Sequence, residues 1–203
     1  TYLRRAVPFD RKQLQQIDFK SEQLRSLAKL SNLPLTDKDQ LAKHNREFLA
    51  VAEEKVVDIC QTSGTTGEPV TIWQTEADLQ RLARNEQQAF VAAGIRASDR
   101  VLVGAALDGV FMAGLAYFLG LRNIGATAIR AGSGQPVLVA ELIRRQRPNV
   151  LVGGPSLLLG IARQFQHSGQ DPSALGVEKL ICIGEPVRNE DLGLSALGVA
   201  LQR

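Results

Sequence analysis

The chain has 203 residues, of which 44% are hydrophobic and 22% are charged, values typical of a globular domain. Its net charge of +3 is too small to indicate a surface that binds nucleic acid. No apolar run reaches the roughly 18 residues that a membrane-spanning helix needs, so we expect neither a nucleic acid nor a membrane as partner.

The first part of the chain is polar and predicts a helical N-terminal segment over residues 1–50. Leucines at three-residue spacing predict a helix over residues 21–30, which Pro34 should separate from the next one. Thr36 is expected to begin that next helix, with Asp39 three residues later as a partial capping box.

A run rich in hydroxyls and glycines lies between two apolar stretches, residues 56–60 and 70–73, which predict strands joined by a tight loop. Such a loop offers backbone N–H groups and hydroxyls to a polyanion such as a triphosphate. Its composition alone leaves open a plain hairpin turn without a ligand. It is not a Walker A motif, because Glu68 rather than lysine follows the second glycine. The loop residues are Thr62, Ser63, Gly64, Thr65, Thr66 and Gly67.

From Thr75 onward, helices alternate with short apolar strands. Thr75 and Asp78 predict the start of a helix that Gly94 ends. Its expected apolar face consists of Leu79, Leu82, Ala89, Phe90 and Ala93. The expected strands are 101–103, 126–129, 150–152 and 179–183, with helices over 111–121, 137–146, 156–166 and from 189 onward. Continuous apolar strands of this kind predict an α/β fold, a parallel sheet flanked by helices on both faces, over residues 51–203.

Each of the last four strands is followed by a loop that contains glycine. Ligands of open α/β sheets bind beyond the carboxyl ends of the strands, so these loops predict a site where a ligand approaches the backbone closely. Connections of this type are often glycine-rich without any ligand, which leaves each single loop open to the simpler interpretation. The loops begin near residues 105, 131, 153 and 184.

In combination these motifs resemble the phenylacetate–coenzyme A ligase branch of the acyl-adenylate-forming, or AMP-binding, superfamily. The resemblance rests on Thr62–Pro69, Gly109–Gly114, Gly153–Ser156 and Gly184–Pro186, and on Leu33-Pro34-Leu35-Thr36 before them. It covers nearly the whole chain but only the front half of such an enzyme. It therefore implies that residues 51–203 are an incomplete AMP-binding domain, that the catalytic residues lie beyond Arg203, and that this fragment alone is inactive.

The resemblance implies that ATP activates a carboxylic acid, an aromatic one in this branch, to an acyl-adenylate that is then transferred to coenzyme A. The cofactors it implies are ATP, Mg²⁺ and coenzyme A. By matching motifs, it assigns ATP phosphate binding to residues 62–67. It assigns adenine binding to Gly184, Glu185 and Pro186, and the acyl pocket to Phe111, Gly114, Pro155 and Ser156.

Several positions depart from the family pattern. Glu68 stands where many members have lysine, and Ala106 stands where the phenylacetate enzymes carry tyrosine. Met112-Ala113 replaces a Thr-Gly pair, and Ile183 replaces a glycine, so the pocket need not fit phenylacetate. Two alternatives stay open: transfer of the acyl group to an amine or a carrier protein, and a non-catalytic module that binds nucleotide or acyl-adenylate.

The two cysteines, Cys60 and Cys182, lie in apolar runs where a thiol behaves as a small core side chain. Their number and placement indicate a cytoplasmic protein without a disulfide framework. His44 and His167 are isolated and give no metal-ligand spacing with the cysteines. A homodimer is compatible with the sequence but is not specified by it.

Overall fold

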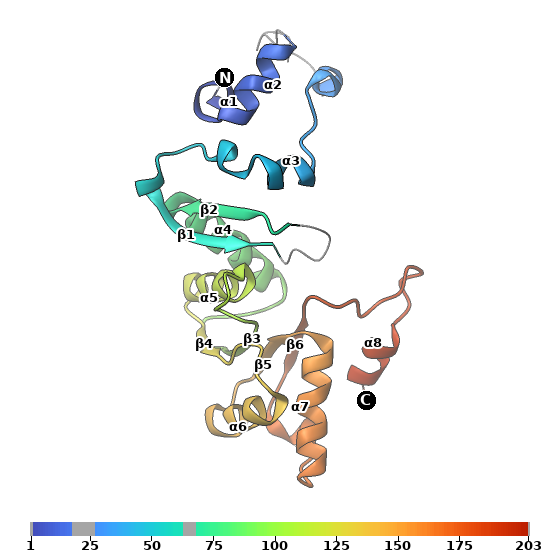
Figure 1. Cartoon of the computed structure of the whole chain (residues 1–203). Helices are drawn as coiled ribbons and strands as arrows, with labels where there is room; N and C mark the ends of the chain where they lie inside the picture. The colour runs from blue at the N-terminus through green and yellow to red at the C-terminus, as the bar shows by residue number, and fades with distance from the viewer. Residues whose placement is uncertain (1, 18–26, 63–67, 203) are drawn as a thin grey trace. The chain divides into compact units, whose positions relative to one another are not determined.

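The structure is a computed structural model that describes residues 2–17, 27–62 and 68–202. The chain divides into two compact units, Thr1–Asp78 and Leu79–Arg203 (Figure 1). The first unit extends past residue 50 and includes the two strands that follow it. A division of the sequence into domains at residue 50 stays a prediction.

The first unit begins with short helices: α1 (Tyr2–Ala6), α2 (Pro8–Gln16), η2 (Leu27–Asn32), α3 (Lys38–Lys43), η3 (Asn45–Phe48) and η4 (Glu53–Lys55). Phe9 of α2 is buried, and its ring centre lies 4.3 Å from that of Phe48 in η3. Part of the helix expected over 21–30 lies outside the described residues, and the part that follows residue 26 is a 3-10 helix.

The start of α3 corrects one prediction. Asp37, rather than Thr36, is the N-cap residue, and the capping partner is Gln40, rather than Asp39. The Asp37 side chain accepts from the Gln40 backbone N–H at 2.7 Å, and the Gln40 side chain accepts from the Asp37 N–H at 3.1 Å. This reciprocal pair satisfies two free donors at once, which an aspartate at position 39 does not do for Thr36.

The second part of the first unit is an antiparallel pair of β1 (Val56–Gln61) and β2 (Thr71–Thr75), which confirms the two predicted strands. Thr62 closes its open end, because its N–H donates to the Val70 carbonyl at 3.1 Å and its hydroxyl accepts from the Val70 N–H at 3.0 Å. After β2, Thr75 and Asp78 cap the start of α4 (Glu76–Ala92), as predicted.

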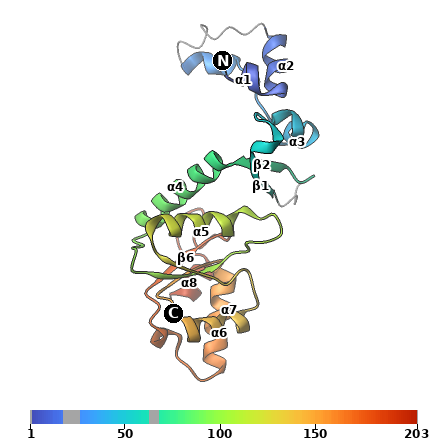
Figure 2. The same cartoon turned by 90° about the vertical axis from the view of Figure 1, so that its left-hand side faces the viewer.

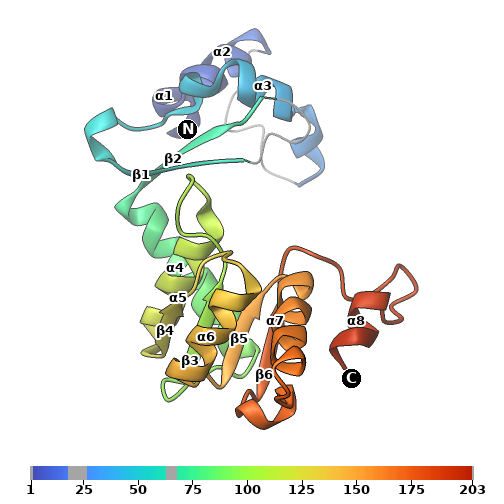
Figure 3. The ribbon, with the colours of Figure 1, turned by 60° about the horizontal axis from the view of Figure 1, so that its bottom comes forward.

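The second unit is built on a four-stranded parallel sheet in the order β4-β3-β5-β6, seen side by side in Figure 3. The strands are β3 (Arg100–Gly104), β4 (Thr127–Arg130), β5 (Val150–Gly153) and β6 (Lys179–Cys182). All three pairings in the sheet are parallel. The structure thus confirms the predicted α/β fold class.

Helices cover both faces of this sheet, and Figure 2 shows α5 on one side and α6 and α7 on the other. The helices are α5 (Met112–Ile124), α6 (Pro136–Gln146), α7 (Pro155–His167), η5 (Pro172–Leu175) and α8 (Ala196–Leu201). Successive side chains of a strand point to opposite faces, so each strand contributes to two cores. Over the described part of the chain, none of the helices is both long and apolar enough to cross a membrane.

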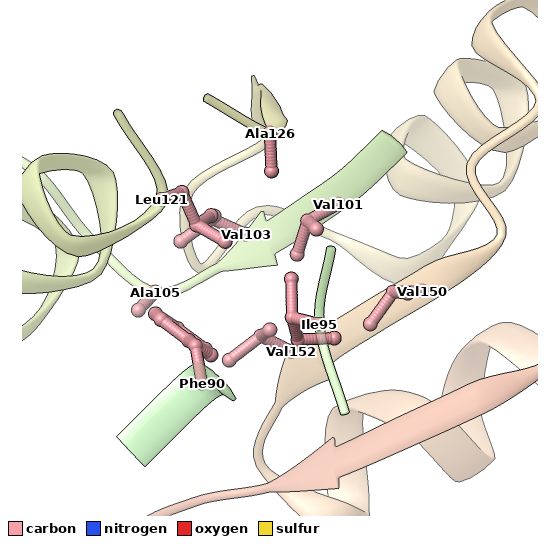
Figure 4. Packing of buried hydrophobic residues seen from close by; sticks show 9 residues of the cluster. All are labelled: Phe90, Ile95, Val101, Val103, Ala105, Leu121, Ala126, Val150 and Val152. Carbon is pink, nitrogen blue, oxygen red and sulfur yellow. The ribbon is translucent and has the colours of Figure 1, made fainter. Parts of the chain in front are cut away.

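The two cores divide the strand residues between them. One face packs Val101, Val103, Val150 and Val152 against Phe90 of α4 and Leu121 of α5 (Figure 4). The other face packs Leu102 and Leu151 against Val139 and Ile143 of α6 and against Leu158, Ile161 and Phe165 of α7. Burial on both faces explains why these strands are continuous apolar runs in the sequence.

Two predictions in this unit were wrong. Ala89 and Ala93, predicted for the apolar face of α4, are exposed, whereas Phe90 is buried as predicted, together with Ala83. No helix begins at Asn189, because its N–H donates to the Gly193 carbonyl at 2.8 Å and closes a turn. Leu192 in that turn has a left-handed backbone (φ 65°), and the next helix, α8, begins only after Ser195.

Candidate functional site

The centre of the sheet is a topological switch point. After β3 the chain crosses through α5 to β4 on one side, and after β5 it crosses through α7 to β6 on the other. Ligands of open α/β sheets bind at the carboxyl ends of the strands where the connections diverge in this way. The loops that follow β3, β5 and β6 therefore form the candidate site of the second unit.

Glycines let the elements at the switch point approach closely. Gly104 and Gly153 are opposite each other in the register of β3 and β5. A Cβ at Gly104 would lie 2.9 Å from Cδ2 of Leu157 and 3.0 Å from the Val152 carbonyl oxygen. Leu157, in the first turn of α7, therefore lies over both strand ends, and a larger residue at position 104 would displace it.

A carboxylate from the β6 end contacts the start of α7. Gly154 is the N-cap residue of this helix, Pro155 occupies its first turn, and Ser156 follows. The Ser156 hydroxyl donates to Oε2 of Glu185 at 2.5 Å, and the Ser156 N–H lies 3.4 Å from Oε1. A negative charge is favourable at this end of a helix, where backbone N–H groups lack partners.

The segment Gly184–Pro186 continues directly from β6. The Ile183 N–H donates to the Gly153 carbonyl at 3.1 Å, which extends the pairing of β6 with β5. Gly184 then takes a left-handed conformation (φ 75°), and at the far end the Ser195 hydroxyl donates to the Pro186 carbonyl at 3.1 Å. Three predicted adenine-binding residues thus lie in one segment that is hydrogen-bonded on both sides.

The β3–α5 loop has an unusual backbone. Gly109 and Val110 are both left-handed, with φ values of 63° and 56°. For a β-branched residue this conformation is a true outlier and costs roughly 1–2 kcal/mol. The two side chains at the tip are exposed, Val110 by 47% and Phe111 by 51%, so the strained loop presents an apolar surface at the carboxyl edge.

Gly114 explains how α5 can begin so close to this loop. A Cβ on Gly114 would lie 2.1 Å from the Ala106 carbonyl oxygen and 2.6 Å from the Ala106 carbonyl carbon. Gly114 and Pro155 are buried. Among the four residues predicted for the acyl pocket, Phe111 and Ser156 are the two that expose surface.

The predicted phosphate loop lies in the first unit. Thr62 is described and closes the hairpin, Glu68 is exposed, and Ser63, Gly64, Thr65, Thr66 and Gly67 lie outside the described residues. In the second unit, the structure brings Ser156 and Glu185 together, although the sequence assigned them to different ligands. Sequence reasoning missed Leu157, whose side chain carries no motif that distinguishes it from a core residue, and the left-handed backbone of Val110 within Gly109–Gly114.

The described residues at the carboxyl edge offer few reactive groups. Within the ranges that the structure describes, no three His, Cys, Asp or Glu side chains gather as a metal site would need. Burial raises the pKa of the Cys182 thiol at the end of β6, so this thiol stays protonated at neutral pH and is a poor nucleophile. The groups that remain are backbone, hydroxyl and carboxylate, which are suited to hydrogen-bonding a ligand.

Comparison with known proteins agrees with this arrangement. The family described as AMP-binding enzyme matches residues 6–193. The chain is 30% identical over 201 residues to phenylacetate-coenzyme A ligase of Pseudomonas putida, covering 95% of this chain and 46% of that protein. It is 31% identical over 186 residues to the enzyme of the same name from Thermus thermophilus, covering 91% of this chain and 42% of that protein. The chain thus spans less than half the length of these relatives.

The fold also has a counterpart among solved structures. The crystal structure of 2-hydroxyisobutyryl-CoA ligase in an open conformation, in complex with 2-HIB-AMP and CoA, superposes with a TM-score of 0.80. The match covers 92% of this chain and 42% of that chain at 24% sequence identity. At this identity the likeness concerns the fold, and it supports the arrangement of sheet and helices described above.

Proposed function

The chain belongs to the AMP-binding enzyme family, and from this premise we propose that the full-length protein activates a carboxylic acid with ATP and transfers the acyl group to coenzyme A. The observation that carries the proposal is the similarity to two phenylacetate-coenzyme A ligases, at 30% and 31% identity, over more than nine-tenths of this chain. The first step would form an acyl-adenylate and release pyrophosphate, and the second would form the thioester.

We propose that residues 62–67 bind the β- and γ-phosphates of ATP. Hydroxyl and backbone N–H donors in a glycine-containing loop suit a triphosphate, whose oxygens are all acceptors. The Thr62 hydroxyl oxygen already accepts from Val70, which leaves its O–H proton as the group that Thr62 could offer. Thr65 and Thr66 are therefore the more informative positions for a test.

We propose that Gly184, Glu185 and Pro186 lie along the adenine and that Phe111 forms one wall of the acyl pocket. The exposed Phe111 side chain at the carboxyl edge supports this role, since a core phenylalanine would be buried. Ala106 leaves more room in the same loop than a tyrosine would. An aromatic acid is the first class to test, with branched and aliphatic acids of similar volume beside it.

The proposed cofactors are ATP, Mg²⁺ and coenzyme A, and the proposed place of action is the cytoplasm, where the free thiols of Cys60 and Cys182 would stay reduced. Mg²⁺ would arrive bound to ATP and neutralise phosphate charge. The described residues show no carboxylate cluster that fits it, so we assign it no ligand in this chain. Glu68, exposed beside the phosphate loop, is the one feature that favours the non-catalytic alternative, because it adds negative charge near the phosphates.

The test is acid-dependent exchange of pyrophosphate into ATP by the full-length protein, with a panel of aromatic, branched and aliphatic acids. Exchange with one class of acid, followed by thioester formation on addition of coenzyme A, is the expected result. Exchange without thioester formation would point to an amine or carrier-protein acceptor. Nucleotide binding without exchange would identify a non-catalytic module and contradict the proposal.

The same assay tests the phosphate loop. Thr65→Val combined with Thr66→Val removes two hydroxyl donors and should raise the KM for ATP at least about tenfold, because a hydrogen bond to a charged group contributes roughly 1.5–3 kcal/mol. Thr71→Val, which changes a threonine of β2 in the same hairpin, is the matched control. An unchanged KM in the double variant would contradict the assignment of the loop.

A further inference from the structure

Glu185 is oriented toward α7, and both of its carboxylate oxygens lie near Ser156. Oε2 accepts from the Ser156 hydroxyl at 2.5 Å, and Oε1 lies 3.4 Å from the Ser156 backbone N–H. The contact joins the first turn of α7, which follows β5, to the segment after the adjacent strand β6, 29 residues further along the sequence. The side chain of Glu185 is thereby directed at the protein.

The approach of Glu185 depends on a glycine. A Cβ on Gly154 would lie 2.8 Å from Oε1 of Glu185, closer than a carbon and a carboxylate oxygen can come. Position 154 is the N-cap of α7 and has an ordinary extended backbone (φ −63°, ψ 138°), which any residue could adopt. A side chain at position 154 would therefore have to displace the carboxylate, which is the far end of the flexible Glu185 side chain.

A second contact holds the other end of the segment. The Ser195 hydroxyl donates to the Pro186 carbonyl at 3.1 Å, and the Ser195 N–H donates to the Val187 carbonyl at 3.0 Å. Gly198 of α8 packs closely against Val187, since a Cβ on Gly198 would lie 2.3 Å from the Val187 carbonyl oxygen. The segment Gly184–Pro186 is thus tied at Glu185 to α7 and at Pro186 to the residue that caps α8.

We propose that Glu185 is a positioning residue: through Ser156 it fixes the backbone of Gly184–Pro186 in the place where that segment receives the adenine. This inference rests on the proposed function, and it assigns the carboxylate to α7 rather than to the nucleotide. Because both oxygens face Ser156, the surface that the segment offers a ligand is its backbone and the Pro186 ring. Ser156, predicted for the acyl pocket, then acts on ATP binding instead.

The role predicts a specific split in the kinetics. Loosening the contact should weaken the binding of ATP and leave the binding of the acid unchanged, since the acid is assigned to the β3–α5 loop. A hydrogen bond to a charged carboxylate is strong when buried, and this one is partly exposed, so we expect an increase of about fivefold to tenfold in the KM for ATP.

The experiment measures KM for ATP, KM for the acid and kcat in the full-length protein for Ser156→Ala, Glu185→Gln, their double variant, and Gly154→Ala. Gly154→Ala is the most informative of these variants, because it keeps both Ser156 and Glu185 and only moves the carboxylate away from α7. We expect each variant to raise the KM for ATP, and the double variant to show little more than the larger single effect, because the two residues form one contact.

Ser173→Ala is the matched control. The Ser173 hydroxyl donates to a carboxylate oxygen of Asp171 at 2.7 Å, at the start of η5, so it removes a bond of the same kind away from the carboxyl edge. It should change none of the three kinetic values. Thermal unfolding of every variant shows whether an effect reflects a loss of folded protein.

Three results would overturn the inference: an unchanged KM for ATP in Gly154→Ala, additive effects of Ser156→Ala and Glu185→Gln, or an increase confined to the KM for the acid. The last would place Ser156 in the acyl pocket. Failure of the proposed function is distinguishable, because the unsubstituted protein would then show no acid-dependent pyrophosphate exchange at all.

Discussion

Side-chain hydrogen bonds join the strands of the parallel sheet at their amino ends. At the carboxyl ends there are instead closely approaching glycines and the carboxylate of Glu185. At the amino end Asp99, only 5% exposed, accepts from the Arg96 N–H at 2.8 Å and from the Asn149 amide at 2.9 Å. Lys179, at the start of β6, lies 3.7 Å from the same carboxylate. Asn149 in turn accepts from the Arg100 N–H at 2.8 Å. This network joins the starts of three strands.

At the carboxyl end the corresponding positions are Gly104 and Gly153, with Gly154 and Glu185 beside them. Glycine ends the two central strands, β3 and β5, and Leu157 of α7 lies over both of these ends. The amino end of the sheet thus carries a side-chain network that joins the strands, and the carboxyl end is where we propose that the ligand binds. Substitutions at the amino end should therefore affect stability, and those in the carboxyl-end loops should affect ligand binding.

Gly114→Ala should have the largest effect on stability. It is an exception to the contrast between the two ends, because Gly114 lies at the carboxyl end but serves packing. The new methyl group would lie 2.1 Å from a backbone oxygen, so α5 must move away from the β3–α5 loop. We expect a loss of about 4 kcal/mol or more in the free energy of unfolding, measured by hydrogen exchange of the β3 and β5 amides.

Gly134→Ala is its control, since the nearest atom to the added Cβ there is an ordinary 3.6 Å away. That variant should change the free energy of unfolding by no more than about 0.5 kcal/mol. Equal effects of the two alanines would show that the close approach of α5 to Ala106 does not determine the packing.

Asp99→Ala should have the next largest effect. It leaves the Asn149 amide and the Arg96 N–H without their acceptor in a partly buried place, which should cost about 3 kcal/mol. Amide exchange in β3 and β5 again gives the measurement, and Asp108→Ala, at an exposed aspartate of the carboxyl end, is the matched variant. If the two aspartates proved equally important for stability, the contrast between the ends would be lost.

The same aspartate predicts a pH dependence of smaller size. The hydrogen bond from Asn149, followed by that from the Arg96 N–H, lowers the pKa of Asp99 from its ordinary value of 3.8. A carboxyl with a lower pKa in the folded state contributes stability above its ordinary pKa, and this contribution is lost as the pH falls through the folded value. Below pH 3.8 the unfolding free energy should therefore fall more steeply in the unsubstituted protein than in Asp99→Asn. Parallel curves would exclude a contribution from this carboxyl.

Phe111→Ala should have the smallest effect on stability. Its ring is half exposed, so truncation should cost less than about 1 kcal/mol, whereas a buried phenylalanine would cost roughly 3–5 kcal/mol. In the full-length protein it should raise the KM for the acid far more than that for ATP. A large drop in melting temperature with an unchanged KM for the acid would identify Phe111 as a packing residue instead.

The strands were predictable from the sequence because burial on both faces leaves no polar alternation, as in Val101–Val103 and Val150–Val152. The start of α4 was predictable because Thr75 and Asp78 form a local cap. Which alanines of α4 are buried was not predictable, because alanine suits both faces of a helix and the buried face depends on how α5 packs against α4. A Cβ on Gly120 of α5 would lie 2.5 Å from Cβ of Glu86.

For the candidate site, the sequence could place glycines at the ends of the strands but could not show what they accommodate. The contact between Ser156 and Glu185 joins two separate motifs, and each motif alone gave its residue a different ligand. The left-handed Val110 also has no signal in the sequence, since valine is the residue least expected in that conformation. Long-range contacts and backbone strain depend on the folded arrangement rather than on local pattern.

The most direct test of the contrast between the two ends compares Asp99→Asn with Ser156→Ala in the full-length protein. For each variant, the free energy of unfolding and the KM for ATP are measured under the same conditions. We predict that Asp99→Asn lowers the free energy of unfolding and leaves the KM for ATP unchanged, and that Ser156→Ala does the reverse. A change of the same quantity in both variants, or a raised KM for ATP in Asp99→Asn alone, would contradict the division of roles between the two ends of the sheet.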